Sequence, residues 1–237
     1  MTDSPENMAE LTIEQAMQIV YSLYAGFAPE MDAETGAGGK LLYAGEADST
    51  GCMVLRAANI AGTASLTASA DAALLRKAMR EGAIDFVVNS LDEALRILKN
   101  EIRKKQPVVV GVSVAPEAIE REMLERGAQP DLLSAHQQPT PELNAFLAHG
   151  ARCIMQQLAL PTDAQFQFFP IPPDWKQPAS AFDALLLDCF APGDALNRRW
   201  VRLAPRYLPA ARRIRMVVCD AGAGLGVIAR MGGAKAE

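Results

Sequence analysis

The feature that most constrains the fold is a strand, turn and helix unit at residues 39–62, GKLLYAGEADSTGCMVLRAANIAG. We predict a strand at Leu41–Ala44 and a loop at Gly45–Gly51, because glycine tolerates positive φ and Asp, Ser and Thr cap helices. The helix is expected at Cys52–Ala61, with Gly62 as its C-terminal stop. In an α/β fold the free N–H groups at such a helix start bind anions. The unit therefore marks a candidate ligand site.

The same strand and helix alternation continues to residue 127. Val108–Val114 is an unbroken apolar run, which is typical of a parallel strand that helices cover on both faces. The further predicted elements are strands at Ala64–Ser69, Ile84–Asn89 and Val108–Val114, and helices from Asp71 to Gly82, from Leu91 to Lys105 and from Pro116 to Gly127. Short connections between them predict a doubly wound, mostly parallel, Rossmann-like α/β sheet with flanking helices. We expect Leu41–Ala44, Ile84–Asn89 and Val108–Val114 at its centre.

The rest of the chain is less regular, and we predict four parts. Residues 1–38 form an N-terminal helix and connection, 39–160 the Rossmann-like domain, 161–180 a linker rich in Pro and aromatic residues, and 181–237 a C-terminal α/β segment that packs with the N-terminal helix. The remaining predicted elements are helices at Thr12–Gly26, Pro141–Leu158, Ala195–Tyr207 and Gly226–Met231, and strands at Ala184–Phe190 and Ile214–Cys219. Gly222–Gly226 is expected to form a tight turn between the last strand and helix.

Composition and charge narrow the function classes. No apolar run reaches the roughly 18 residues of a membrane helix, and the N-terminus is acidic and polar, so we expect a cytoplasmic protein without a membrane partner. The net charge of −5 argues against nucleic-acid binding. Arginines crowd residues 198–215, where we interpret them as a solvated helix face, with an anion or partner site as the alternative. A homo-oligomer is left open.

Several single residues are candidates for chemistry. His136 could act as a general acid or base, or could be a hydrogen-bonded loop residue. The thiol of Cys52 lies near a helix start that could lower its pKa, although a buried cysteine is the plainer interpretation. Tyr43 and Trp200 are interpreted as core residues. The scattered cysteines and the two histidines predict neither a metal site nor a disulfide.

Residues 39–133 resemble the central NAD-binding region of urocanase, the lyase that hydrates urocanate with NAD as its electrophile. The resemblance rests on the glycine turn and the helix after it, on the residues before the third strand, and on later matched positions. These residues are Ala44-Gly45, Gly51, Ala57-Ala58-Asn59-Ile60-Ala61-Gly62, Gly82-Ala83-Ile84-Asp85, Leu91-Asp92-Glu93-Ala94-Leu95, Gly111, Arg126-Gly127 and Pro130-Asp131. Residues 195–215 are similar to the segment that leads into the family's last core strand.

The resemblance implies NAD as cofactor. It also implies a set of candidate cofactor-binding residues, namely Gly45, Ser49, Thr50, Gly51, Asp71, Gly111 and Ser113. This chain departs from the family at the chemical positions. Glu46 and Asp48 occupy the middle of the glycine turn, where they would repel a pyrophosphate or form a carboxylate pair. Val114 and Ala115 replace a Gly-Asn pair, and the family's later catalytic stretch has no recognisable counterpart.

These departures predict a urocanase-like protein that has lost urocanate hydration and binds another small molecule or a partner. The alternatives are an active NAD-dependent hydratase with a remodelled site, or a non-catalytic structural or regulatory subunit. We expect any ligand against Gly45, Ser49, Thr50 and Gly51, and expect it to be neutral or hydroxyl-bearing. On this hypothesis Gly51→Val abolishes binding and leaves the thermal stability nearly intact.

Overall fold

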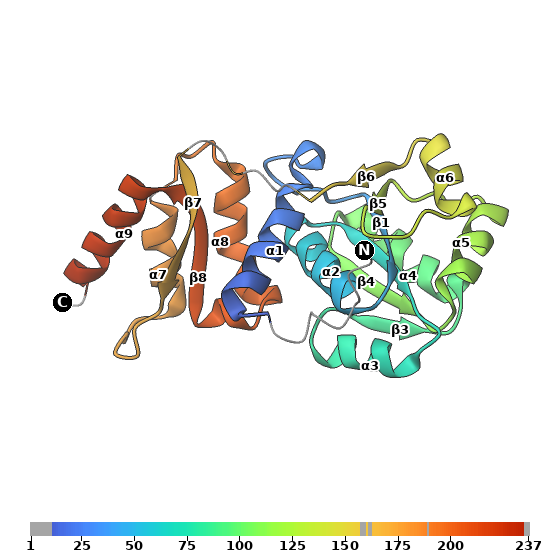
Figure 1. Ribbon diagram of the computed structural model, residues 1–237, viewed down its shortest axis with the longest axis horizontal. Coiled ribbons are helices and arrows are strands. Elements are labelled where there is room, and N and C mark those ends of the chain that lie inside the picture. Colours follow the sequence, from blue (N-terminus) through green and yellow to red (C-terminus); the bar gives the residue numbers. More distant parts are fainter. Residues whose placement is uncertain (1–10, 157–159, 161–162, 189, 235–237) are drawn as a thin grey trace, which may run out of the picture. The chain divides into compact units, whose positions relative to one another are not determined.

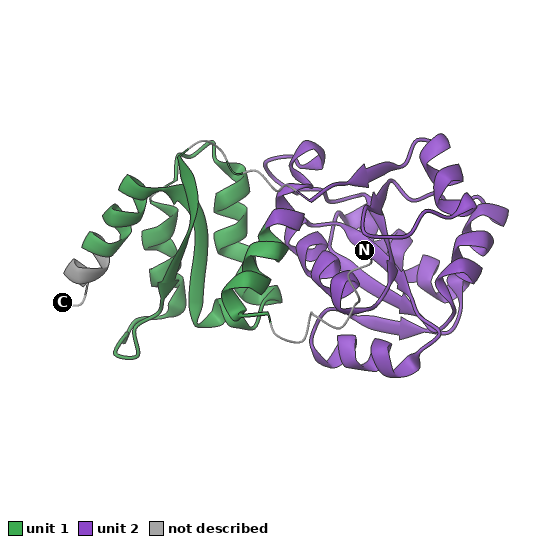
Figure 2. Ribbon diagram, in the orientation of Figure 1, with its two compact units in different colours: residues 1–21, 157–237 green, residues 22–156 purple. Residues whose placement is uncertain are grey.

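The computed structural model describes residues 11–156, 160, 163–188 and 190–234. The chain divides into two compact units, which are residues 22–156 and the combination of residues 1–21 with 157–237 (Figure 2). The division falls inside helix α1 (Ile13–Ala25), which lies within the predicted helix at Thr12–Gly26.

The unit of residues 22–156 contains a six-stranded parallel sheet (Figure 1). Its strand order is β3-β4-β2-β1-β5-β6. The strands are β1 (Leu41–Glu46), β2 (Ala64–Ala68), β3 (Phe86–Val88), β4 (Val108–Val112), β5 (Leu132–Ser134) and β6 (Arg152–Ile154). The helices between them are α2 (Ser49–Ala61), α3 (Ala72–Arg80), α4 (Leu91–Lys104), α5 (Pro116–Glu125) and α6 (Pro141–Ala148).

Helices cover both faces of this sheet. Alternate residues of β1, including Leu41 and Tyr43, pack in one hydrophobic cluster with Leu98 of α4, Ile119 of α5 and Phe146 of α6. Helices α2 and α3 contact the sheet as well, α2 at β1, β2 and β4 and α3 at β3. Every residue of β2 and β4 is buried. Because successive residues of a strand face opposite sides of the sheet, this burial requires a layer of helices on each face. The predicted doubly wound α/β fold is confirmed.

The predicted position of the third strand is wrong. Strand β3 is at the edge of the sheet, pairs only with β4, and leaves Phe86 49% exposed. Ile84, the first residue of the predicted strand, comes before β3 and packs inwards. The weaker segment Ala64–Ala68 lies between β4 and β1 instead, and its small residues are buried throughout.

Two other boundaries in this unit differ from the prediction. Strand β1 continues through Gly45 to Glu46 and α2 begins at Ser49, so the loop is shorter than Gly45–Gly51. The helix predicted at Pro141–Leu158 ends at Ala148, because Gly150 adopts φ +104° and the chain then enters β6. Residues 157 and 158 of that prediction lie outside the described residues.

The second unit contains an antiparallel pair, β7 (Ala164–Pro170) and β8 (Ile214–Asp220), with helices α7 (Ala179–Leu187), α8 (Ala195–Tyr207) and α9 (Ala221–Ala234). Trp200 of α8 is buried and donates from Nε1 to the carbonyl of Met216 at 2.8 Å, which confirms its prediction as a core residue. Tyr21 of α1 packs edge-on against Trp200 and Phe166, and its hydroxyl donates to Asn197 Oδ1 at 2.7 Å.

Three predictions in the C-terminal region are wrong. The predicted linker 161–180 contains β7, which Pro170 ends and which pairs along its whole length with β8. The predicted strand at Ala184–Phe190 is mostly helix α7, because Phe182 and Leu186 are spaced by one turn and both are buried. The Gly222–Gly226 turn is helical, since Asp220 Oδ1 accepts from Ala223 N at 2.9 Å and starts α9.

Candidate functional site

In the turn between β1 and α2, groups of the protein itself hydrogen-bond and pack against the start of the helix. Asp48 is the N-cap of α2, and its Oδ1 accepts from the backbone N–H of Gly51 at 2.7 Å. A Cβ atom at Gly51 would lie 2.0 Å from the carbonyl oxygen of Glu46. Glycine is therefore required at this position for the helix to approach the strand. One of the N–H groups that could receive an anion is already satisfied by a carboxylate.

Because Gly45 has no side chain, the side chain of Gln137 packs directly against its backbone. Its φ is +75°, and a Cβ there would lie 2.8 Å from Cδ of Gln137. Gln137 donates from Nε2 to the carbonyl of Tyr43 at 3.0 Å, while Thr67 donates to the carbonyl of Gly45 at 2.7 Å. Oε1 of Gln137 is buried and has no hydrogen-bond partner among the described residues. The space over Gly45 is thus occupied by an amide that still has a free acceptor.

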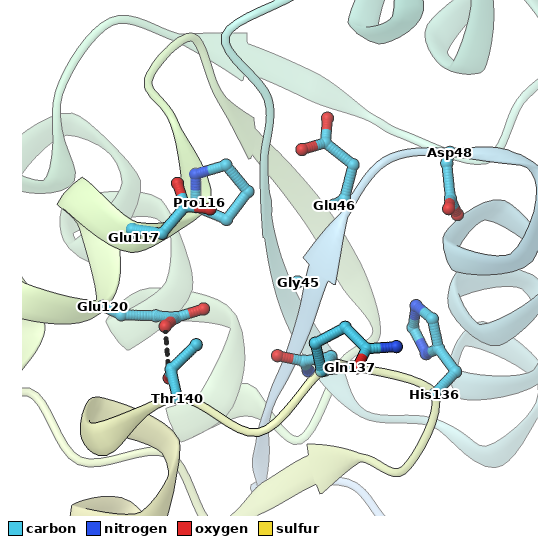
Figure 3. Close-up of a pocket in the computed structure, with 10 residues that line it drawn as sticks. Gly45, Glu46, Asp48, Pro116, Glu117, Glu120, His136, Gln137 and Thr140 are labelled. Carbon is cyan, nitrogen blue, oxygen red and sulfur yellow. Dashed lines mark hydrogen bonds between the residues drawn. The ribbon is translucent and has the colours of Figure 1, made fainter.

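A cavity of about 300 Å³ opens beside this turn (Figure 3). The chain leaves the sheet from β1 towards β2 on one side, and β5 lies on the other side of β1. In open α/β sheets ligands bind at such a switch point, outside the carboxyl ends of the strands. The cavity is lined by the end of β1, the first turns of α5 and the loop after β5, through Gly45, Glu46, Asp48, Pro116, Glu117, Glu120, His136, Gln137, Gln138 and Thr140.

Carboxylates dominate the charge of this cavity. Glu46, Asp48, Glu117 and Glu120 line it, and the described lining includes no lysine or arginine. Glu46 and Asp48 had been considered as a pair from the sequence, and the structure adds two further carboxylates from α5. Ionised carboxylates are acceptors only, so the arrangement suits a ligand that carries positive charge or several N–H donors.

Glu120 is the buried member of the four, with 3% of its surface exposed. The hydroxyl of Tyr43 donates to its Oε1 at 3.0 Å, and the hydroxyl of Thr140 donates to its Oε2 at 2.9 Å. Figure 3 shows the contact with Thr140 across the cavity wall. Burial raises the pKa of Glu120, and the two hydroxyl donors oppose that shift. Tyr43 is itself fully buried, as predicted for a core residue.

His136 lines the cavity opposite Glu120 and Glu117 (Figure 3). Its Nδ1 is hydrogen-bonded to the hydroxyl of Ser134, the last residue of β5. Burial lowers the pKa of His136, and the nearby Asp48 carboxylate partly opposes this. Burial therefore favours the neutral imidazole, and the hydrogen bond to Ser134 at the end of β5 orients its ring. His136 is thus a hydrogen-bonded loop residue, one of the two interpretations from the sequence, and its role as a general acid or base stays a prediction.

The seven candidate cofactor-binding residues do not come together in one cavity. Gly45 lines the cavity just described, and Ser49 lines a separate one between α2 and α3. Thr50 and Gly51 belong to the first turn of α2. The other three have local roles: Asp71 caps α3 by accepting from Ala73 N at 2.7 Å, Gly111 is buried in β4 where a Cβ would lie 3.0 Å from Leu75, and Ser113 N donates to Val88 O at 2.9 Å.

Sequence reasoning missed Glu120 and Gln137. Glu120 lies between the buried Ile119 and the buried Met123 on α5, but a glutamate on an amphipathic helix is normally read as exposed. Gln137 follows β5 in a loop without a motif. The available signal was only its position after a strand, and the order of the strands was needed to place that position next to Gly45.

The described residues do not fit NAD. The pyrophosphate would meet Glu46 and Asp48 in a cavity whose described lining includes no lysine or arginine, at a helix start that Asp48 already caps. Gln137 fills the space over Gly45. Cys52, for which a lowered pKa was considered, is buried, and burial raises the pKa of its thiol.

The described residues offer neither a group of metal ligands nor a membrane-spanning helix. Among them, no group of three or more His, Cys, Asp or Glu side chains could hold a metal ion. No described helix has both the length and the apolar composition to cross a membrane.

The sequence matches the family model of the urocanase Rossmann-like domain over residues 22–153. This range includes the whole parallel sheet except the final residue of β6, and both walls of the cavity. It is more than half of the chain and nearly coincides with the compact unit of residues 22–156. The protein belongs to the urocanase family through its Rossmann-like domain.

Proposed function

We propose that this protein binds a small organic cation in the cavity at the carboxyl end of β1, and that it does not hydrate urocanate. The observation that carries the proposal is the set of four carboxylates around one cavity of about 300 Å³, with no lysine or arginine in its described lining. The volume is at the lower end of the roughly 300–1,000 Å³ typical of ligand pockets. It suits a ligand the size of a diamine or a guanidinium compound.

The buried Glu120 is the strongest contributor to this preference. Asp48 and Glu117 are exposed, so water and salt screen them. Glu120 is removed from water, and its two oxygens already accept from Tyr43 and Thr140. A ligand ammonium or guanidinium group near it would compensate a charge that is otherwise costly to bury.

This ligand class replaces the neutral, hydroxyl-bearing ligand expected from the sequence. That expectation relied on Ser49 and Thr50 as donors and on two carboxylates. Ser49 lies on another cavity, and Thr50 is not among the residues that line this one. With four carboxylates as acceptors, the donors have to come from the ligand.

Calorimetric titration with matched probes tests the binding. Putrescine and agmatine are expected to bind, 1,4-butanediol to bind much more weakly, and succinate not at all. Glu120→Gln keeps the shape of the side chain but removes its charge. We expect it to lower the affinity for agmatine by about tenfold, which corresponds to the loss of one charge-assisted interaction. Glu125→Gln, an exposed change on the same helix, is the control. Binding of succinate, or equal agmatine affinity in both variants, would refute the proposal.

The loss of hydratase chemistry has its own test. Incubation of the protein with urocanate and NAD is expected to leave the ultraviolet band of urocanate unchanged. Mass spectrometry of the denatured protein is expected to find no dinucleotide carried through purification. Disappearance of the band would support the alternative of an active hydratase with a remodelled site. A protein that binds neither cations nor NAD would favour the structural or regulatory subunit.

A further inference from the structure

Strand β7 has an outer edge that pairs with no other described strand. It pairs along its whole length with β8, and the two strands form a sheet of their own. The free N–H and C=O groups at a sheet edge can pair with another chain, so natural edges are commonly short, charged or covered. The edge strands β3 and β6 of the six-stranded sheet have three residues each, whereas β7 has seven. The edge of β7 is therefore a candidate interaction surface.

The hydrogen bond at the end of β7 shows which of its backbone groups point outwards. Ile171 N donates to Arg213 O at 2.9 Å, so this pair is hydrogen-bonded across to the β8 side. Bonded and non-bonded pairs alternate along antiparallel strands, which directs the N–H and C=O groups of Ala164, Phe166 and Phe168 away from β8. These outward groups have no hydrogen-bond partner among the described residues. They offer donors and acceptors at the spacing of a strand.

The outer edge of β8 differs, because the protein itself covers it. Met216 lies opposite Phe168, so by the same alternation its carbonyl points away from β7. Trp200 donates to this carbonyl from Nε1 at 2.8 Å, and α8 packs along β8 (Figure 1). A strand from another chain would have to displace the buried Trp200. Pairing is consequently open at β7 and closed at β8, which favours an assembly of two copies over an extended one.

The side chains of β7 are largely used inside the unit, so the backbone is what remains for a partner. Phe169 packs with Phe182 of α7 and Val227 of α9 on one side of the sheet, and Phe166 packs edge-on against Tyr21 of α1 on the other. The strand carries no charged residue, and its register against β8 is unbroken. Neither a charge nor a bulge therefore protects the edge. A row of unpaired N–H and C=O groups matches an extended backbone rather than a helix or a small molecule.

We propose that β7 pairs antiparallel with β7 of a second copy of this chain, about a twofold axis at Phe166. Two identical antiparallel strands present the same groups to each other, so one open edge is enough for a closed dimer. A pairing centred on Phe166 uses the outward groups of Ala164, Phe166 and Phe168 in both copies. An uncharged strand brings no like charges together across the axis. The dimer is independent of cation binding, because β7 and the cavity at the carboxyl end of β1 belong to different units.

Sedimentation equilibrium over a series of protein concentrations tests for this dimer. A single pair of edge strands buries a limited area, so we expect a reversible equilibrium rather than a permanent dimer. The average mass should rise with concentration from 25.4 kDa towards twice that value.

A pair of charge variants tests whether β7 forms the interface. The exposed Gln165 lies next to the proposed axis, and its two copies would be diagonal neighbours about 7–8 Å apart across the new strand pair. Gln165→Lys and Gln165→Glu are each expected to raise the dissociation constant several-fold, since like charges meet across the axis. An equimolar mixture of the two variants is expected to recover at least the wild-type affinity. Gln177→Lys, an exposed change in the loop after β7, is the control.

Hydrogen exchange measured by NMR locates the new hydrogen bonds in the wild-type protein. The amides of Phe166 and Phe168 should exchange more slowly as the protein concentration rises, because dimerisation gives them acceptors. The amide of Gln167 points towards β8 and is already bonded there, so its exchange should not change with concentration.

The proposal fails if the protein stays monomeric at the highest concentration that it tolerates. A dimer whose dissociation constant is the same in the Gln165 variants and in Gln177→Lys would use another surface. A mixture that associates no more tightly than the single variants would contradict pairing about Phe166. Slow exchange of Phe166 and Phe168 in a monomer would show that a segment of the same chain covers this edge.

Discussion

At the scale of single residues, Gly51 shows why a glycine in a ligand-binding motif does not by itself indicate a ligand. It was expected to give a ligand room near the helix start. The space that it leaves is instead taken by the carbonyl of Glu46, which would lie 2.0 Å from a Cβ at this position. The glycine is needed for packing of α2 against β1.

This contact reverses the stability expected for Gly51→Val. Because the obstacle is backbone, the helix or strand must move, and we expect destabilisation of at least about 2 kcal/mol. Urea unfolding measures the change. Gly193→Ala, at a position where no heavy atom lies within 4 Å of the added Cβ, is the control and should be near neutral. A Gly51→Val protein as stable as the wild type would contradict the packing seen here.

The ionisation of Glu120 makes the free energy of unfolding depend on pH. Its pKa is raised in the folded state, so between the ordinary glutamate pKa and the raised value the folded state binds the proton more tightly than the unfolded state does. The contribution of this group to stability therefore decreases as the pH rises through that window. Unfolding at a series of pH values should show that Glu120→Gln gains stability relative to the wild type towards neutral pH. A constant difference at all pH values would mean that Glu120 titrates normally.

At the scale of elements, Asp48 has two separable roles. It caps α2, and it is one of the four carboxylates that line the cavity at the carboxyl end of β1. Asp48→Ser keeps a side-chain acceptor for the N–H of Gly51 and removes the charge. Asp48→Ala removes both, and we expect it to be about 1 kcal/mol less stable than Asp48→Ser. Both variants should weaken agmatine binding to a similar extent. Thermal unfolding and calorimetric titration of the two proteins measure these effects. If the two variants differ in affinity for agmatine but not in stability, the capping role and the charge role of Asp48 are not separable in this way.

Strand order should be visible in hydrogen exchange. Strands β2 and β4 are buried throughout and lie inside the sheet, whereas β3 is at its edge and partly exposed. We expect amides of residues 64–68 and 108–112 to exchange much more slowly than those of residues 86–88, because edge amides open locally at lower free energy. Exchange followed by mass spectrometry measures this. Equal protection of the three segments would require a different strand order.

At the scale of the whole molecule, each of the two compact units contains a hydrophobic cluster and a buried charged side chain of its own. In the unit that contains β7 and β8, Arg215 is 3% exposed and pairs with Asp183 through contacts of 2.6 and 3.2 Å. Asp183→Asn would leave a buried cation without its counter-charge, at a cost of about 3 kcal/mol. We expect faster hydrogen exchange in β7 and β8 and unchanged exchange in β2 and β4. Arg202→Gln, an exposed change on α8, is the control, and equal loss of protection in both units would show that they unfold together.

The sequence by itself determined the class of the fold, because its signals there are local. Val108–Val112 is apolar at every position, as a strand covered on both faces requires, and α4 begins at Leu91, where the helix was predicted to begin. The turn after β1 was recognised from its glycines and from Asp48. These features depend on residues within a few positions of one another, so they are readable without knowledge of the remaining chain.

The tertiary structure alone decided where strands and side chains meet. Apolar content placed residues 84–89 at the centre of the sheet, but pairing placed β3 at the edge, because position in a sheet depends on partners distant in sequence. Residues 164–170 became a strand only by pairing with residues 214–220. Glu120 and Gln137 reach the same cavity because β5 lies beside β1, although these residues are far from Gly45 along the chain. Charge in a cavity is a sum over such contacts, and that sum exists only once the chain has folded.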